Sequence, residues 1–171
     1  MWIYARRISP DANFQHINTK PPLPFENETF DLIVSYSVFS HLSGAHGLAW
    51  IRELSRVLKP DGIICITSFG LGHYEVVMTS DPEKLPPNRK NIHLPYFKSR
   101  ERAPESFKKG DLVYLPGDGA VFDETEYGMT LLSPRYVERM WGDFLELVYH
   151  VDHPDVLEQG FFALRKKRRS A

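Results

Sequence analysis

The chain has 171 residues, of which 42% are hydrophobic and 25% charged, and its formal net charge is −1. That length predicts a single domain with a sizeable core, and the charge argues against a general attraction to nucleic acid or an anionic membrane. No stretch approaches the roughly 18 consecutive apolar residues of a membrane-spanning helix, and residues 1–13 show no signal peptide. The single cysteine, Cys65, allows no intrachain disulfide, which fits a cytoplasmic protein.

The first part of the chain predicts little regular structure. Residues 2–8 have the pattern of a helix end, and residues 13–16 are a candidate short strand. The proline-rich segment 18–24 is not expected to be helical, because proline fixes the backbone and removes a hydrogen-bond donor.

Two apolar runs predict neighbouring strands of a parallel sheet. Residues 30–36 have the continuous apolar centre Leu32-Ile33-Val34, and residues 63–67 form a second such run. Continuous apolar runs are typical of strands that are buried on both faces, whereas half-exposed strands alternate. We therefore expect both runs to lie inside one sheet.

A helix is predicted between these two strands. Its apolar face over residues 45–58 consists of Leu48, Ile51, Leu54 and Leu58, spaced as in an amphipathic helix. Ser43 is the expected N-cap, and Pro60-Asp61-Gly62 is the expected turn after the helix. A strand–helix–strand unit of this kind has a right-handed crossover and therefore parallel strands.

Residues 69–129 differ in composition from the rest of the chain. They contain six of the thirteen prolines and six of the eleven glycines. A segment of this length without structure of its own is uncommon in a compact domain, so we expect an insertion with short elements. One is predicted to be a hairpin in which residues 112–114 pair with residues 120–122.

The last part of the chain predicts a helix and two strands. Ser133-Pro134 has the pattern of an N-cap followed by proline at the first helical position. The expected apolar face of this helix consists of Tyr136, Val137, Met140 and Trp141. Residues 144–150 and 160–164 are predicted to form a closing antiparallel pair. The basic run 165–169 is expected to be a solvated tail, with contact to phosphate as the alternative.

Four short strings occur in order within forty residues and together resemble one family. They are Leu23-Pro24-Phe25, Phe30-Asp31-Leu32-Ile33, Ser37-Val38-Phe39-Ser40-His41-Leu42 and Arg56-Val57-Leu58-Lys59-Pro60-Asp61-Gly62. Their spacing resembles the second half of the core of class I methyltransferases that use S-adenosylmethionine (SAM), and residues 133–166 are similar to that family's terminal helix and strand pair. The resemblance implies an α/β fold with an incomplete doubly wound, Rossmann-like, mostly parallel sheet and an inserted subregion at about 69–129.

The resemblance also implies where the cofactor lies. Open α/β sheets bind ligands beyond the carboxyl ends of their strands. By position in the family, Ser35, Tyr36 and Ser37 would lie under the methionine part of SAM, and Asn18 and Thr19 would hold the adenine edge. The alternative is that the two serines only satisfy backbone groups at a strand end.

The family's glycine-rich loop has no counterpart, because no glycine precedes Gly44. The resemblance therefore implies an N-terminally truncated member of the family, whose sheet is left with an open edge.

His41 is the candidate catalytic base, since it follows the predicted cofactor loop and imidazole titrates near neutral pH. The alternative is a histidine that is hydrogen-bonded to backbone at the start of the next helix. Asp118 and Asp123 are weaker candidates, because acidic residues near glycine turns are often turn formers. The seven histidines show no metal-binding spacing, so no metal site is predicted.

Two functions follow as expectations. The first is methyl transfer from SAM to a small molecule or glycan, at oxygen or carbon, with residues 69–129 on the acceptor side. The sequence Ser35-Tyr36-Ser37-Val38 lacks the Asn/Asp-Pro-Pro-Tyr pattern of enzymes that methylate amino groups, which argues against a nucleic-acid substrate. The second is a degenerate, non-catalytic module that acts through a protein partner or through self-association covering the open sheet edge.

Overall fold

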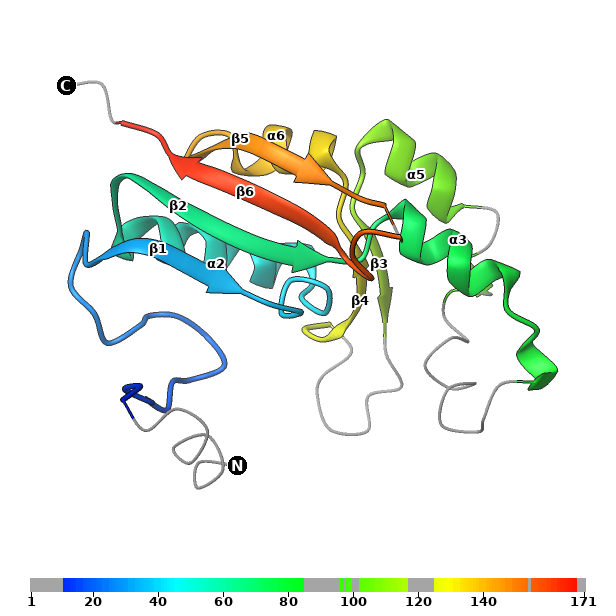
Figure 1. Ribbon diagram of the computed structural model, residues 1–171, viewed down its shortest axis with the longest axis horizontal. Coiled ribbons are helices and arrows are strands. Elements are labelled where there is room, and N and C mark those ends of the chain that lie inside the picture. The colour runs from blue at the N-terminus through cyan, green and yellow to red at the C-terminus, as the bar shows by residue number, and fades with distance from the viewer. Residues whose placement is uncertain are drawn as a thin grey trace.

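The structure is a computed structural model that describes residues 11–84, 96, 98–99, 102–116, 125–153 and 155–168. Its elements in chain order are β1 (Phe30–Ser35), α2 (Gly44–Val57), β2 (Leu58–Ser68), α3 (Leu71–Thr79), η1 (Pro82–Lys84), α5 (Ala103–Lys109), β3 (Val113–Pro116), β4 (Gly128–Leu131), α6 (Pro134–Trp141), β5 (Leu145–Val151) and β6 (Gly160–Lys166) (Figure 1). The predicted helix end at 2–8 lies outside the described residues. Residues 13–16 form no strand, so that prediction is wrong.

The main sheet has the strand order β1-β2-β6-β5 (Figure 1). β1 runs parallel to β2, with Leu32 opposite Ile63 and Ser35 opposite Ile66. β6 pairs antiparallel with both β2 and β5. The predicted α/β fold, the parallel pair around α2 and the closing antiparallel strands are all confirmed.

The Pro60-Asp61-Gly62 turn lies within β2 rather than before it. Phe30 pairs with Leu58, and Leu32 already pairs with Ile63, so the intervening residues of β2 form an irregularity in the register. Asp61 has a positive φ of 62°, which is uncommon for a residue other than glycine. The prediction of a turn was right locally, but the strand continues on both sides of it.

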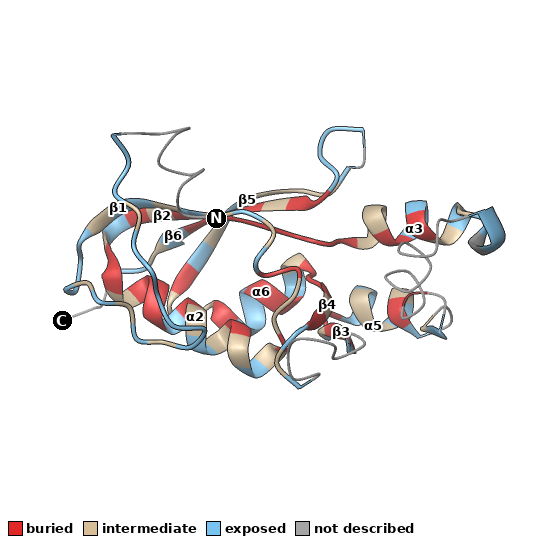
Figure 2. Ribbon diagram, turned by 90° about the horizontal axis from the view of Figure 1, so that it is seen from below, coloured by how far each residue is buried: buried red, intermediate tan, exposed pale blue. Residues whose placement is uncertain are grey.

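Helices cover only one face of the sheet. Ile64, Ile66 and Phe162 point to this face and are fully buried against α2 and α6. Figure 2 shows both helices on the same side of the sheet, and no helix of the described residues on the other side. Among the described residues, the sheet is therefore a two-layer structure rather than a doubly wound one with three layers.

The opposite face of the sheet is apolar and partly open. The parallel register places Leu32 beside Ile63 and Val34 beside Cys65 on this face, and Leu32 and Val34 are 57% and 68% exposed. The expectation that β1 is buried on both faces is therefore wrong. An apolar run shows only that the side chains are hydrophobic. They are buried on both faces only where other elements cover both faces of the sheet. We call Leu32, Val34, Ile63, Cys65 and Ala163 the open face.

Residues 69–131 include a second, smaller core. It consists of Phe69, Tyr74, Val77, Tyr96, Ala103, Val113, Leu115 and Leu131. β3 pairs antiparallel with β4, from Val113 opposite Leu131 to Pro116 opposite Gly128. The first strand of the predicted hairpin is thus present, but the strand that pairs with it in the structure is β4. The predicted return strand at 120–122 lies outside the described residues.

The caps of the two larger helices behave differently. The Ser133 hydroxyl accepts a hydrogen bond of 3.1 Å from the Tyr136 amide, as an N-cap should. Ser43 occupies the N-cap position of α2, but its hydroxyl bonds His46 Nδ1 instead. The predicted apolar face of α6 is buried at Tyr136, Val137 and Trp141, whereas Met140 is exposed, contrary to expectation.

A buried ion pair attaches the proline-rich segment to α2. Glu53 accepts hydrogen bonds from the Arg56 guanidinium at 2.6 and 2.9 Å and from the Leu23 amide at 2.7 Å. Arg56 also donates to Asn27 and to the Leu23 carbonyl. A segment that forms no regular structure is in this way held against the helix before it enters β1.

Candidate functional site

The carboxyl ends of β1 and β2 lie side by side, since Ser35 pairs with Ile66. The loop that follows β1 and the residues that end β2 meet at this edge of the sheet. Ligands of open α/β sheets bind at such an edge. The family resemblance predicted the cofactor at the same edge. The edge is our candidate site.

A closed set of hydrogen bonds fixes the loop after β1. The Ser37 amide donates to Thr67 Oγ1, Thr67 Oγ1 donates to Gln159 Oε1, and Gln159 Nε2 donates to Ser37 Oγ, each at 2.8 Å. Ser37 Oγ also lies 3.3 Å from Ser40 Oγ. We call Ser37, Thr67 and Gln159 the hydroxyl–amide ring. It joins the ends of β1 and β2 to the start of β6.

The structure brings only some of the predicted cofactor residues together. Ser35 and Ser37 are half-buried at the strand end, and the Tyr36 side chain between them is 70% exposed. Asn18 and Thr19 are exposed, and within the described residues no hydrogen bond or ion pair joins them to this loop. The chain next to them is tethered by an ion pair of 2.5 Å between Lys20 and Glu126.

His41 lies in a defined environment beside the loop. Its Nδ1 is 2.9 Å from the carbonyl oxygen of Gly128, so Nδ1 must carry the proton, and in the neutral ring Nε2 keeps the lone pair. The imidazole stacks on Tyr127 at 4.8 Å and meets the edge of Phe69 at 5.8 Å. The backbone contact foreseen in the alternative reading is present, and it leaves Nε2 in the state that a general base needs.

Sequence reasoning missed several residues at this edge. Phe69, just after β2, stacks on His73 of α3 at 4.2 Å, so aromatic side chains gather beside His41. Thr67 is the last residue of the strand predicted at 63–67, and Phe69 lies two residues beyond it, so their position at the strand end could have indicated a role at this edge. Gln159 is separated from Ser37 by 122 residues, and only the sheet topology brings the two together.

Asp118 and Asp123 lie outside the described residues. In the part of the chain that the structure describes, no group of three or more histidine, cysteine or acidic side chains is arranged to hold a metal ion. None of the described helices is both long and apolar enough to cross a membrane.

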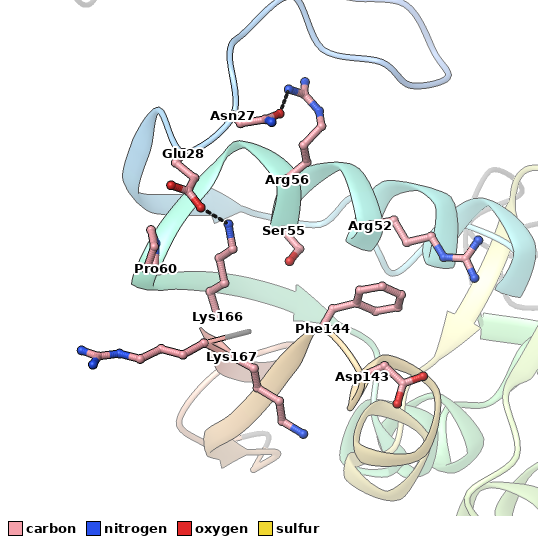
Figure 3. A pocket seen from close by; sticks show the side chains of 11 residues that line it. Asn27, Glu28, Arg52, Ser55, Arg56, Pro60, Asp143, Phe144, Lys166 and Lys167 are labelled. Carbon is pink, nitrogen blue, oxygen red and sulfur yellow. Dashed lines mark hydrogen bonds and ion pairs between the residues drawn. The ribbon is translucent and has the colours of Figure 1, made fainter. Parts of the chain in front are cut away.

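A broad cavity of about 840 Å³ lies at the other end of the sheet, away from these residues (Figure 3). Its lining includes Arg52, Arg56, Lys166, Lys167 and Arg168. Most of these cations already have partners: Arg56 pairs with Glu53, Lys166 donates to the Leu58 carbonyl at 2.6 Å, and Arg168 pairs with Asp61. In Figure 3, Arg52 and Lys167 point in different directions, so the cavity offers no convergent set of free charges.

These contacts also correct a prediction about the basic run. Arg165 and Lys166 belong to β6, and Lys166 and Arg168 bind the beginning of β2. The first two residues of the run are therefore part of the sheet, whereas Lys167 and Arg168 follow β6 and are exposed, as predicted for a tail.

The comparisons with known proteins agree with this fold. A sequence family described as a methyltransferase domain matches residues 3–66. The solved PH0226 protein of Pyrococcus horikoshii aligns over 98% of this chain and 65% of its own, with 15% identity and a TM-score of 0.57. A SAM-dependent methyltransferase of Methanosarcina mazei aligns over 91% of this chain and 68% of its own, with 17% identity and a TM-score of 0.52.

The chain therefore spans about two thirds of the length of each of these two structures. No curated protein matches it significantly in sequence. The matched segment contains all four strings of the sequence analysis, and it covers β1 and α2 together with most of β2. Over this segment the chain is similar to the methyltransferase-domain family, and over most of its length it shares the fold of the two solved structures.

Proposed function

We propose that the chain binds SAM at the carboxyl edge of β1 and β2 and takes part in methyl transfer to a small molecule or glycan, at oxygen or carbon. The observation that carries this proposal is the loop after β1, which the hydroxyl–amide ring fixes beside the end of a parallel strand pair. The family match over this region supports the same cofactor.

The residues at this edge suit part of the cofactor. The Ser35 side chain would face its polar amino-acid end, Ser37 would hold the loop in place through the ring, and the exposed Tyr36 ring offers a flat apolar surface. Asn18 and Thr19 would approach the adenine edge. Residues 11–43 contain no glycine, so the described segment before α2 provides no close backbone cradle of the kind that glycine allows.

When bound, SAM supplies an electrophilic methyl group. His41 Nε2 would accept the proton of an acceptor hydroxyl, because its Nδ1 proton is already engaged with Gly128. Phe69 and Tyr127 would shield this proton transfer from water on two sides of the imidazole. Alignment of the reacting groups contributes much of the rate in such transfers.

Calorimetric titration with S-adenosylhomocysteine (SAH) tests the cofactor site. Binding is expected for the wild-type chain and is expected to be weaker for Tyr36→Ala. Tyr149→Ala is the matched control, since Tyr149 is also exposed but lies on the far edge strand β5. Absence of both heat and thermal stabilisation at millimolar SAH would remove the cofactor site from this chain.

The open face favours a second candidate function. We propose that a non-catalytic form of the protein acts by self-association, with a second copy covering the open face. β1 is a terminal strand of the sheet among the described residues, and it carries the exposed side chains Leu32 and Val34, so one contact would cover both its edge and these side chains. The net charge of −1 leaves little repulsion between copies.

Light scattering coupled to size-exclusion chromatography tests this second candidate. A mass twice that of the chain, without SAH binding, would support it. A monomer at all concentrations would exclude self-association.

A further inference from the structure

The hydroxyl–amide ring links three residues that lie far apart in the sequence. Thr67 Oγ1 accepts the Ser37 amide proton, and its own proton points to Gln159 Oε1. The other end of the same amide, Nε2, then donates to Ser37 Oγ. Gln159 thus donates and accepts at the same time, and its amide bridges the hydroxyl groups of Ser37 and Thr67.

The ring lies where the backbone needs support. Ser37 has a φ of 56°, in the left-handed region that residues other than glycine adopt at a cost. Thr67 and Gln159 are each only 8% exposed, and Ser40 is fully buried. Buried and satisfied hydrogen bonds of this kind hold one conformation against its alternatives.

The loop that the ring supports carries the residues of the proposed site. Tyr36 precedes Ser37, and His41 follows four residues later, with its amide bonded to the Val38 carbonyl at 3.0 Å. A change at Ser37 would therefore be transmitted to both sides of the loop. Gln159 itself comes from the distant segment before β6, and its hydrogen bonds to Thr67 and Ser37 do not involve His41.

We infer that Gln159 is a positioning residue, which holds residues 36–41 in the conformation that the cofactor edge requires. This inference rests on the proposed function. It assigns to the segment before β6 a role in a site that is otherwise built by β1 and β2.

Gln159→Glu separates hydrogen bonding from packing. A protonated carboxyl has the shape of the amide and can both donate to Ser37 and accept from Thr67. The ionised form can only accept, so the Ser37 hydroxyl would have to donate to it and would change its contact with Ser40. The acidic groups near this end of β6 are Glu158 and Asp152, whose Cβ lies 3.5 Å from the Cβ position at Gly160. Burial and both of these carboxylates favour the protonated form of the introduced group.

The experiment is SAH titration between pH 5.5 and 8.5 with the wild type, Gln159→Glu and Gln15→Glu. Gln15 is exposed, so Gln15→Glu adds the same charge without touching the ring. Relative to this control, Gln159→Glu is expected to bind normally at low pH and about tenfold more weakly at high pH. An affinity ratio that does not change with pH would overturn the inference, because a purely structural role produces no such profile.

Hydrogen exchange separates failure of the inference from failure of the proposed function. If the wild type binds no SAH, the proposed function fails, and amide exchange in the unliganded protein decides the inference. Exchange over residues 36–41 is expected to be faster in Gln159→Leu than in the wild type, with β5 unchanged. Equal exchange over this loop would overturn the positioning role even if SAH binds. If Gln159→Leu does not fold, Gln159→Glu at high pH provides the same comparison.

Discussion

The carboxylate of Asp152 lies where a side chain on Gly70 would stand. A Cβ built on Gly70 would overlap both carboxylate oxygens of Asp152. One of these oxygens also accepts the Gly72 amide at 3.3 Å, so Asp152 caps the first turn of α3 from outside the helix. Gly70 has an ordinary extended backbone with a φ of −120°. Glycine is therefore required at position 70 because a side chain would clash with Asp152, and not because the backbone conformation excludes other residues.

Gly70→Ala is predicted to destabilise the protein by about 1–3 kcal/mol, because the added methyl group displaces Asp152. Gly47→Ala is the control, since a Cβ on Gly47 meets nothing within 4 Å and alanine is favoured over glycine in a helix by about 1 kcal/mol. Urea unfolding measures both. In Gly70→Ala combined with Asp152→Ala, the cost should be smaller than the sum of the single changes, and simple additivity would contradict the clash.

We predict that the free energy of unfolding falls in acid because of Glu53. The hydrogen bond and charge of Arg56 hold the pKa of the Glu53 carboxyl below its usual value, although burial opposes this. In the unfolded chain the carboxyl titrates near its usual pKa of about 4.3. The stabilisation is thus complete above that pH and is lost as the pH falls through the lower folded-state pKa.

Glu53→Gln should therefore cost about 1–3 kcal/mol at pH 7 and change less than the wild type between pH 5 and pH 3. Unfolding by urea across this range is the measurement. Glu105→Gln removes an exposed carboxylate that pairs with Lys109 and should have little effect on stability at neutral pH. Parallel acid profiles for the wild type and Glu53→Gln would refute the prediction.

We predict that His150 also makes the free energy of unfolding depend on pH, at a higher pH than Glu53 does. Burial lowers the pKa of its imidazole, although Asp152 opposes this, and its Nε2 is buried without a partner among the described residues. The unfolded chain takes up the proton near the usual pKa of about 6.5. Stability therefore falls as the pH drops from above 6.5 towards the lower folded-state pKa.

His150→Leu should remove this slope between pH 7 and pH 5. His153→Leu, at an exposed position, should leave it in place. The midpoint of thermal unfolding at several pH values reports both. The same slope in His150→Leu as in the wild type would assign the effect to another group.

We predict that a charge introduced on the open face changes the oligomeric state of the protein. Val34→Lys places a charge at the centre of this face, whereas Val156→Lys alters a residue of similar exposure, 63% against 68%, in the loop between β5 and β6. If two copies cover the open face, Val34→Lys should be monomeric and Val156→Lys should remain a dimer. Light scattering measures this, and the same mass for both variants would rule out contact through the open face.

The sequence predicted the elements whose signals are local. Apolar runs marked β1 and β2, and Ser133-Pro134 marked the start of α6, where the predicted cap is formed. The same logic failed at Leu32 and Val34, because an apolar side chain is buried only where another layer covers it. It also failed at residues 13–16, which pair with no strand among the described residues.

The candidate site could be predicted only in part. The loop at Ser35, Tyr36 and Ser37 lies at the expected edge, because the end of a strand can be read from its apolar run. The partners of Ser37 could not be predicted, because Gln159 reaches it through the topology of the sheet and not through sequence proximity. The position of Asn18 and Thr19 rested on the family alone, and the structure adds no contact that supports it.

The position of β6 has a consequence for how the protein is made. β6 lies between β2 and β5, although among the described strands it is the last to be synthesised. The ribosome must therefore release residues 160–166 before β2 can acquire its second neighbour, and the nascent sheet stays incomplete until then. Pairings between segments so distant in the chain form slowly, so we expect folding to depend on protection of β2 from aggregation until β6 pairs with it.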